Sequence, residues 1–151
     1  MTQPDQAQIS LRKAVLDDCD QVYAWRNNPA TRQYFLDPSP VAYETHVAWM
    51  QKVLAAPDKA LLIGEMSSQP FGVLRYDFSD HTAEVSVYID PDRHGHGLGS
   101  QLLQAGTHWI RKHHGDVTLL RARVLCENAS SARAFEKAGY DRKIIVYEQS
   151  V

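Results

Sequence analysis

Three things are scarce in this 151-residue sequence: cysteine, long apolar runs and an excess of charge of either sign. Two cysteines, Cys19 and Cys126, are too few for a disulfide framework, so we expect buried thiols. No apolar run approaches the roughly 18 residues that span a bilayer. The N-terminal residues MTQPDQAQIS lack the charged and apolar regions of a signal peptide. These absences predict a cytoplasmic protein with no membrane contact. Residues 1–8 are expected to be flexible.

The charge balance excludes a further class of partner. Lysine plus arginine number 16 and aspartate plus glutamate number 18, which leaves a formal net charge of −2. A protein dedicated to nucleic acid is expected to carry a basic surface instead. The seven histidines show no spacing of a metal-ligand set, so we expect no metal. With 44% hydrophobic residues, the chain has material for one well-packed domain spanning residues 1–151.

Apolar periodicity predicts six strands and four helices. Alternating or continuous apolar runs favour strands at 8–14, 60–66, 71–78, 83–89, 117–126 and 142–148. Apolar residues at helical spacing favour helices at 16–26, at 40–56 with Pro40 in the first turn, after residue 97, and at 128–138. Residues 31–39 are expected to form a loop. This order predicts an α/β protein with a mixed, mostly antiparallel sheet and helices on both faces.

The sharpest motif is the glycine-rich segment Arg93-His94-Gly95-His96-Gly97-Leu98-Gly99-Ser100, between a predicted strand and a predicted helix. Alternate glycines allow tight turns and expose consecutive backbone N–H groups, which the positive end of the following helix complements. A phosphate or pyrophosphate is the natural ligand for such a loop. The segment lacks the lysine of a P-loop, and its G-x-G-x-G spacing differs from the dinucleotide-binding G-x-G-x-x-G.

Two segments resemble motifs of the GNAT N-acetyltransferases. Residues 90–100, followed by Leu102 and Leu103, resemble the family's acetyl-CoA pyrophosphate loop, and residues 128–140 resemble its N-x-x-[AS]…Y-x-K-x-G-[FY] segment. The resemblance implies the GNAT fold with splayed central strands, acetyl-CoA as co-substrate and no metal. The positions that it assigns to cofactor binding are Val87, Tyr88, Ile89, His94, Gly95, His96, Gly97, Leu98, Gly99, Ser100, Asn128, Ser131 and Phe135.

The sequence departs from the family pattern at two places. His94 and His96 stand where relatives usually carry arginine, glutamine or lysine, so phosphate affinity is expected to fall as pH rises through the histidine pKa. Phe135 stands where many relatives use a tyrosine to protonate the leaving thiolate, and a phenyl ring has no proton to donate. Another group, or water, must then supply that proton, or CoA leaves as a thiolate.

The resemblance also implies direct attack of an amine on the thioester, with Glu84 at the position of a carboxylate base. Glu84 accepts the ammonium proton directly or through a water molecule in this interpretation. The alternative is an ordinary strand residue that pairs with Arg75 or Arg123.

The acceptor side is expected to be basic and aromatic. The resemblance places it on the first two helices and the third strand, where the candidate substrate-binding residues are Arg26, Asn27, His46, Trp49, Arg75 and Tyr76. Phrases such as residues 22–27 and 72–77 are similar to the acetyltransferases of pseudaminic-acid biosynthesis. That similarity implies a nucleotide-linked acceptor, the 4-amino group of a UDP-linked 4-amino-4,6-dideoxy-N-acetyl-altrosamine.

Other functions stay open at this stage. A protein N-terminus, a polyamine or another small amine is an alternative acceptor. A non-catalytic acetyl-CoA-binding domain is a second alternative, because Phe135 replaces the expected acid. Members of the fold often dimerise, so a homodimer is compatible with the resemblance.

Overall fold

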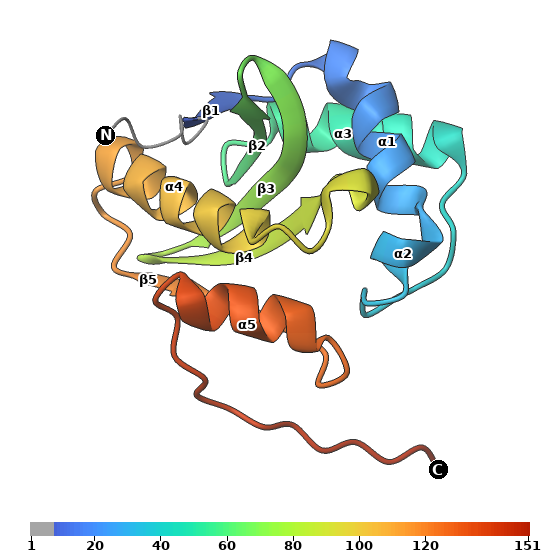
Figure 1. Ribbon diagram of the computed structural model, residues 1–151, viewed down its shortest axis with the longest axis vertical. Coiled ribbons are helices and arrows are strands. Elements are labelled where there is room, and N and C mark those ends of the chain that lie inside the picture. Colours follow the sequence, from blue (N-terminus) through green and yellow to red (C-terminus); the bar gives the residue numbers. More distant parts are fainter. Residues whose placement is uncertain (1–7) are drawn as a thin grey trace, which may run out of the picture.

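A computed structural model describes residues 8–151, so the expectation of flexibility for residues 1–8 falls almost wholly outside the described part (Figure 1). The strands are β1 (Ile9–Lys13), β2 (Lys59–Met66), β3 (Gln69–Ser79), β4 (Thr82–Ile89) and β5 (Leu119–Arg121). The α-helices are α1 (Cys19–Asn27), α2 (Pro29–Arg32), α3 (Tyr43–Ala55), α4 (Leu98–His113) and α5 (Ala129–Lys137). Two short 3-10 helices are η1 (Leu16–Asp18) and η2 (Pro91–Arg93).

The five strands form one sheet in the order β1-β2-β3-β4-β5. Neighbouring strands are antiparallel except β4 and β5, which are parallel. The β2–β3 hairpin turns at Ser67 and Ser68, whose φ angles of 50° and 64° match a two-residue turn of the mirror-image type. The predicted mixed, mostly antiparallel α/β sheet is confirmed.

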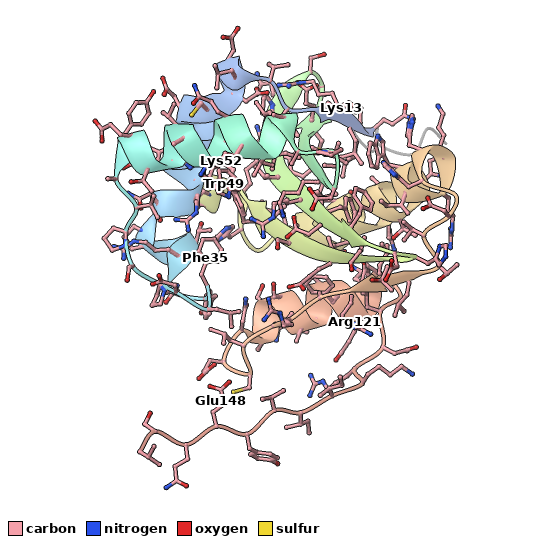
Figure 2. The ribbon with its side chains drawn as sticks, turned by 180° about the vertical axis from the view of Figure 1, so that it is seen from behind. Lys13, Phe35, Trp49, Lys52, Arg121 and Glu148 are labelled. Carbon is pink, nitrogen blue, oxygen red and sulfur yellow. The ribbon has the colours of Figure 1, made fainter. Side chains whose placement is uncertain are left out.

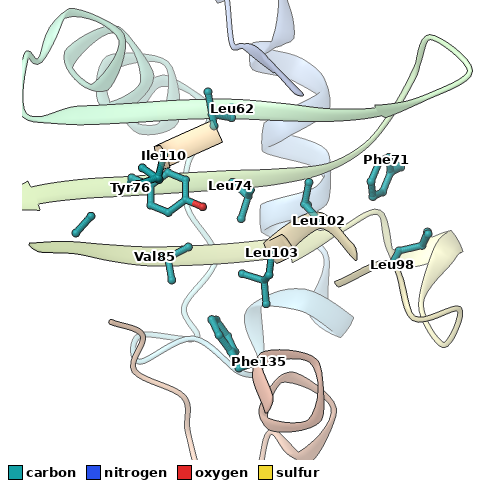
Figure 3. Close-up of a cluster of buried hydrophobic side chains, with 11 residues drawn as sticks. Leu62, Phe71, Leu74, Tyr76, Val85, Leu98, Leu102, Leu103, Ile110 and Phe135 are labelled. Atoms are coloured by element: carbon teal, nitrogen blue, oxygen red, sulfur yellow. The ribbon is translucent and has the colours of Figure 1, made fainter. Parts of the chain in front are cut away.

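Helices cover both faces of the sheet, as predicted. Alternate residues of β3 and β4 point to opposite faces, so Leu74 and Val85 pack beneath α4 while Val73 packs beneath α1 and α3. Leu102 and Leu103 of α4 and Phe135 of α5 complete the first cluster, which Figure 3 shows in close-up. The second cluster is built around Val22, Trp25, Met50, Val53 and Ile63.

The parallel strands β4 and β5 separate after a short contact. Their register joins Thr82 to Leu119, Ala83 to Leu120 and Glu84 to Arg121, whereas β4 continues to Ile89. Within residues 8–151, no strand pairs with the β5 side of β4 beyond Glu84. This is the splay that the family resemblance implied, and it leaves backbone groups of β4 open to a ligand.

Two predicted strands differ from the structure. The segment 117–126 forms a strand only at Leu119–Arg121, because β4 diverges from it after that point. The segment 142–148 forms no strand: among the described residues no neighbouring strand pairs with it, and Ile144, Ile145 and Val146 are at least 70% exposed. A strand needs an edge to bond to, and periodicity alone cannot say whether one is present.

The helices on the acceptor side also differ in detail. Pro40 does not lie in the first turn of α3, which begins at Tyr43. The backbone N–H of Val41 donates a hydrogen bond to the Asn27 side chain at 2.8 Å, and this bond holds Val41 in the segment before the helix. The segment expected to be a loop from residue 31 begins within α2. The Asn28 side chain caps α2 by accepting from the Ala30 N–H, and Pro29 occupies its first turn. Asn28 is thus both the last cap of α1 and the first cap of α2, which Pro29 begins.

The cysteines do not behave alike. Cys19 is buried in the α1–α3 cluster, where burial raises the pKa of its thiol. Cys126 is exposed, which corrects the expectation of two buried thiols, because it follows the point where β5 leaves the sheet.

Candidate active site

The glycine-rich loop joins β4 to α4 and is shaped by its backbone. The Asp90 side chain accepts a hydrogen bond from the Asp92 N–H and so begins η2. Gly95 and Gly97 then adopt φ angles of +84° and +71°, which disfavour any other residue. A Cβ atom built on either glycine would meet no atom within 4 Å. The loop therefore leaves open space beside its backbone, and we call it the cradle. Gly97 is the N-cap of α4, and the N–H groups of the first turn have no partner within the helix.

The side chains of this loop are partly engaged. Nε2 of His94 lies 3.0 Å from the carbonyl oxygen of Ile89, so the ring folds back onto the end of β4. Oγ of Ser100 donates to the carbonyl oxygen of Gly97 at 3.0 Å and is buried at the start of α4. His96 is exposed. The loop therefore offers chiefly its backbone N–H groups to a ligand, and such groups at a helix N-terminus suit an anion.

Helix α5 is fixed beside α4 by the second motif. Asn128 caps it by accepting from the Ser131 N–H at 3.1 Å, and the Gly99 backbone approaches Ala134 closely. Phe135 is 7% exposed and packs edge-on against Tyr140 at 5.0 Å between ring centroids. Through these residues α5 packs beside the start of α4, next to the glycine-rich loop. The phenyl ring points into the core (Figure 3), so it offers an apolar surface and no proton.

On the opposite face of the sheet, two arginines and a tyrosine come together. The Arg26 guanidinium lies over the Phe35 ring at 5.3 Å, and that of Arg75 lies over the Trp49 ring at 5.9 Å. The Phe35 ring in turn contacts Tyr88, 6.1 Å between centroids. Figure 2 shows Phe35 and Trp49 on the side of the molecule where α2 and α3 lie. This face borders the splayed end of β4, to which Tyr88 belongs.

Three polar atoms of this group are buried without a hydrogen-bond partner in the described part of the chain: Nη1 of Arg26, Nε of Arg75 and the hydroxyl of Tyr88. Burial raises the pKa of Tyr88, although the charges of Arg26 and Arg75 act against it, so the phenol stays protonated and is a donor. We call Arg26, Arg75 and Tyr88 the donor cluster. Buried donors without partners are uncommon in folded proteins and match a site for an oxyanion.

Glu84 lies at the point where β4 and β5 separate. It is opposite Arg121 in the last paired rung, and its Oε1 accepts from Nε and Nη2 of Arg123, each at 2.9 Å. Successive side chains of β4 point to opposite faces of the sheet. Ala83 and Val85 point into the core beneath α4, so Glu84 and Tyr88 point to the other face, which carries Arg75. Although it is paired with Arg123, the Glu84 side chain is 40% exposed.

Three of the residues predicted to bind the acceptor have other surroundings. Tyr76 is 0% exposed and stacks on Trp109 on the opposite face of the sheet, so its predicted place in the acceptor site is wrong. His46 is 1% exposed between Tyr23 and Trp49. The side chain of Asn27 is hydrogen-bonded to Tyr23 and to the Val41 backbone. Strand parity would have separated Tyr76 from Arg75, because neighbouring residues of a strand face opposite sides.

Two members of the acceptor face, Phe35 and Tyr88, lie outside the predicted acceptor set. Phe35 falls in the segment expected to be a loop, and Tyr88 is predicted only as a cofactor-binding residue. Alternation along β4 could have placed the Tyr88 side chain beside Arg75, since Ser86 and Tyr88 are two residues apart and Ser86 is opposite Arg75. No local signal marks Phe35, because the fold alone brings it to Arg26.

Metal and membrane sites receive no support from the described residues. In residues 8–151, no three His, Cys, Asp or Glu side chains converge as a metal site would require. Over the same range, no helix combines the length and apolar character needed to cross a membrane.

The structure combines a splayed mixed sheet with an open glycine loop at the start of α4, the two features that the family resemblance implies. Residues 8–141 match the family model described as the acetyltransferase (GNAT) domain. The chain therefore belongs to the GNAT acetyltransferase family. It is an N-acetyltransferase that uses acetyl-CoA as co-substrate, as the resemblance of its two motifs implied.

Individual relatives agree with this family. The provisionally named phosphinothricin acetyltransferase YwnH of Bacillus subtilis (strain 168) is 31% identical over 141 residues, covering 87% of this chain and 83% of the relative. The spermidine N-acetyltransferase of Vibrio cholerae, solved with CoA and spermine, has a TM-score of 0.84 at 17% identity and covers 95% of this chain and 87% of its own. Aminoglycoside acetyltransferase AAC(6')-Ib, solved with coenzyme A and kanamycin, has a TM-score of 0.79 at 18% identity, covering 90% and 86%.

Proposed function

We propose that this enzyme acetylates the primary amine of a phosphorylated acceptor, namely the 4-amino group of a UDP-linked 4-amino-4,6-dideoxy-N-acetyl-altrosamine. The observation that carries the proposal is the donor cluster. Arg26 and Arg75 each hold a buried guanidinium nitrogen without a partner, and the Tyr88 hydroxyl lies in the same group. Guanidinium groups form short, charge-assisted hydrogen bonds to phosphate oxygens, so a diphosphate would satisfy these donors.

The reaction is a direct transfer. The neutral amine attacks the carbonyl carbon of the acetyl thioester, a C–N bond forms, and the C–S bond to CoA breaks. The proton released from the amine goes to Glu84, directly or through a water molecule. Since both hydrogen bonds from Arg123 fall on Oε1, the proton is taken by Oε2. CoA leaves as the thiolate or takes a proton from water, because Phe135 has none to give.

Positioning supplies the larger part of the rate enhancement. The open backbone of β4 at Val87, Tyr88 and Ile89 would hold the pantetheine arm, and the loop at 94–100 would hold the pyrophosphate. Holding two reactants in an attacking geometry is worth up to ~7–11 kcal/mol. The donor cluster then anchors the acceptor by its phosphates, so that its amine lies between Glu84 and the thioester.

A second candidate is a small amine without a nucleotide. It is favoured by the relative that bears the name phosphinothricin acetyltransferase at 31% identity. Polyamines and protein N-termini fit less well, because Arg26 on the acceptor face repels a cation, whereas the charge of Arg75 is paired with Asp77 at 3.3 Å.

Product analysis separates these acceptors. The protein is incubated with acetyl-CoA and, in parallel, with the UDP-linked 4-amino sugar, phosphinothricin or spermidine, and each product is measured by mass spectrometry. A gain of one acetyl group on the nucleotide sugar alone supports the proposal. Acetylated phosphinothricin with an unchanged nucleotide sugar selects the second candidate. If only spermidine is acetylated, the donor cluster has no acceptor role and the proposal is wrong.

A further inference from the structure

Arg75, a member of the donor cluster, has a guanidinium group that is held by two other side chains. It lies over the Trp49 ring at 5.9 Å, and its Nη2 is 3.3 Å from Oδ2 of Asp77. Its Nε, in contrast, is buried and has no hydrogen-bond partner in the described part of the chain. Two contacts therefore fix the guanidinium and leave Nε available to a ligand.

The carboxylate of Asp77 is itself anchored by the neighbouring strand. Arg75 and Asp77 are two residues apart on β3, so their side chains point to the same face of the sheet. Asp77 lies opposite Lys59 of β2, and Nζ of Lys59 donates to Oδ1 of Asp77 at 3.2 Å. Each oxygen of the carboxylate thus contacts one cation, since Oδ1 meets the ammonium of Lys59 and Oδ2 the guanidinium of Arg75. Lys59 therefore holds the carboxylate in place beside Arg75.

The pair with Asp77 stabilises a partly buried cation without using Nε. The Arg75 side chain is 32% exposed, and a guanidinium that loses water needs an opposite charge. A carboxylate placed at Nε would occupy the unpartnered donor, whereas one at Nη2 leaves it free. Arg26 differs, because it has no ion-pair partner among residues 8–151. Arg26 therefore offers positive charge to a ligand, and Arg75 offers a donor of fixed direction.

We propose that Asp77 is a positioning residue of this acetyltransferase, which orients Arg75 so that its Nε donates to an oxyanion of the acceptor. The inference rests on the proposed function, since the oxyanion is the one that the donor cluster would bind. Asp77 acts through Arg75 and not on the reacting atoms. An arginine without such a partner occupies many rotamers, and ordering it on binding lowers affinity. With Asp77 in place, that ordering has already occurred in the folded protein.

A second role for Asp77 has to be separated from this one. In the pairing of β3 with β4, Asp77 lies directly opposite Glu84. Like charges in such a cross-strand pair repel each other, so removal of the Asp77 charge also alters the surroundings of the proposed base. The two roles have different kinetic consequences. The direction of the Arg75 donor governs acceptor binding and hence KM, whereas a change at Glu84 affects kcat.

Solution NMR of the isotope-labelled protein tests the positioning without any acceptor. The Nε–H signal of Arg75 is identified by its loss in Arg75→Lys, and its order parameter reports how firmly the group is held. We expect a rigid signal in the wild type and an order parameter below about 0.6, the range of flexible groups, in Asp77→Asn. The matched control is Asp80→Asn, which removes a charge from the turn after β3, where φ is 53° and asparagine is equally suited. A flexible signal in the wild type, or an equally rigid one in Asp77→Asn, overturns the proposal.

Steady-state kinetics then tests the consequence for the reaction, with the acceptor that the product analysis identifies. Asp77→Asn should raise the acceptor KM about threefold or more, while kcat and the KM for acetyl-CoA change by less than about twofold. Arg75→Met should raise the acceptor KM at least as much. In the Arg75→Met background, Asp77→Asn should add nothing, because its effect is transmitted by Arg75.

The outcomes distinguish this inference from the proposed function. If Arg75→Met raises the acceptor KM and Asp77→Asn does not, Asp77 has no positioning role and the donor cluster remains. If Arg75→Met itself has no effect, Arg75 does not bind the acceptor, and the proposed function loses its support together with this inference. A lower kcat at constant KM in Asp77→Asn would show that Asp77 acts on Glu84 instead.

Discussion

The carboxylate of Glu84 and the guanidinium of Arg123, 39 residues apart in the chain, are joined by two contacts of 2.9 Å to a single oxygen. The pair bridges the gap between β4 and the segment that follows β5, just beyond their last paired rung. Because the side chains are 40% and 66% exposed, solvent screens their attraction and the pair adds little to stability. The ion pair instead fixes the position of the Glu84 carboxylate, which it holds at the opening between β4 and β5, on the acceptor side.

Replacing Glu84 by glutamine therefore tests chemistry rather than folding. If Glu84 takes the amine proton, Glu84→Gln lowers kcat by about 10²- to 10⁴-fold and leaves the melting temperature unchanged. Initial rates with saturating acetyl-CoA measure this. The matched control is Glu136→Gln, another exposed glutamate paired with an arginine, Arg142, at 3.2 Å. Equal rates for the two variants would make Glu84 an ion-pair residue only.

Arg26 is expected to act on the acceptor and not on the cofactor. Arg26→Ala should raise the KM for the acceptor by about tenfold or more while the KM for acetyl-CoA stays constant, since a hydrogen bond to a charged group is worth about 1.5–3 kcal/mol. Arg26→Lys should restore little, because an ammonium group cannot stack as a plane on Phe35. Arg142→Ala, 68% exposed on the surface, is the control. Parallel rises in both KM values would contradict this assignment.

The cradle depends on the backbone of Gly97. Gly97→Ala places a side chain at φ +71°, which costs about 1–2 kcal/mol, without touching any neighbour. CoA affinity, measured by isothermal titration, should fall by about tenfold. Gly115→Ala is matched, because a Cβ there also meets nothing within 4 Å and its φ is not in the left-handed region. If the two variants bind CoA equally, the loop conformation does not determine affinity.

Tyr76 and Gly106 are expected to be coupled in the core. A Cβ on Gly106 would clash with the Tyr76 hydroxyl, which is buried without a partner in the described residues. Gly106→Ala should therefore lower the free energy of unfolding by about 1–3 kcal/mol. Tyr76→Phe alone should be neutral or stabilising, since it removes an unsatisfied hydroxyl, and should restore part of the loss in the double variant. Urea unfolding of the four proteins measures the coupling.

The same substitution tests the placement of Tyr76. Because its side chain lies on the α4 face, Tyr76→Phe should leave the KM for every acceptor unchanged. A marked rise in an acceptor KM would return Tyr76 to the substrate site. A destabilisation by Tyr76→Phe would mean that its hydroxyl has a partner in solution.

His46 predicts how stability depends on pH. Burial lowers the pKa of His46 below its ordinary value of 6.5, and the charge of Arg26 adds to this effect. The unfolded chain then binds the proton more readily, so stability present at neutral pH falls as the pH drops below about 6.5 and levels off below the folded-state pKa. Unfolding measured from about pH 7 to about pH 5, a range that includes the ordinary histidine pKa, should show this decline.

His46→Leu should remove the decline, whereas His108→Gln, at an exposed position of α4, should keep it. The effect is distinct from that of Asp18, whose pKa is lowered by its hydrogen bond to Arg12. Asp18 loses its contribution only below its ordinary value of 3.8. A decline that persists in His46→Leu would place its origin in another group.

The sequence by itself determined most of the strands and helices in their order, the glycine loop and the cap of α5, but not α2 or the absence of a strand at 142–148. These are local properties: apolar spacing sets the elements, and positive φ angles at Gly95 and Gly97 follow from residue type. Asn128 begins its helix through a side chain only three residues from its partner. The two family motifs rest on such short-range features, which is why the acetyltransferase family could be predicted before any contact was known.

Only the tertiary structure decided which side chains meet. Arg26, Arg75 and Tyr88 come from α1, β3 and β4, so their convergence depends on how the helices pack on the sheet. Tyr76 and Arg75 are neighbours in sequence, yet the pleat sends one into the core and the other to the acceptor face. Residues 142–148 have the composition of a strand, but a strand exists only where another edge supplies its hydrogen bonds. Local periodicity does not specify which distant parts of a chain pair.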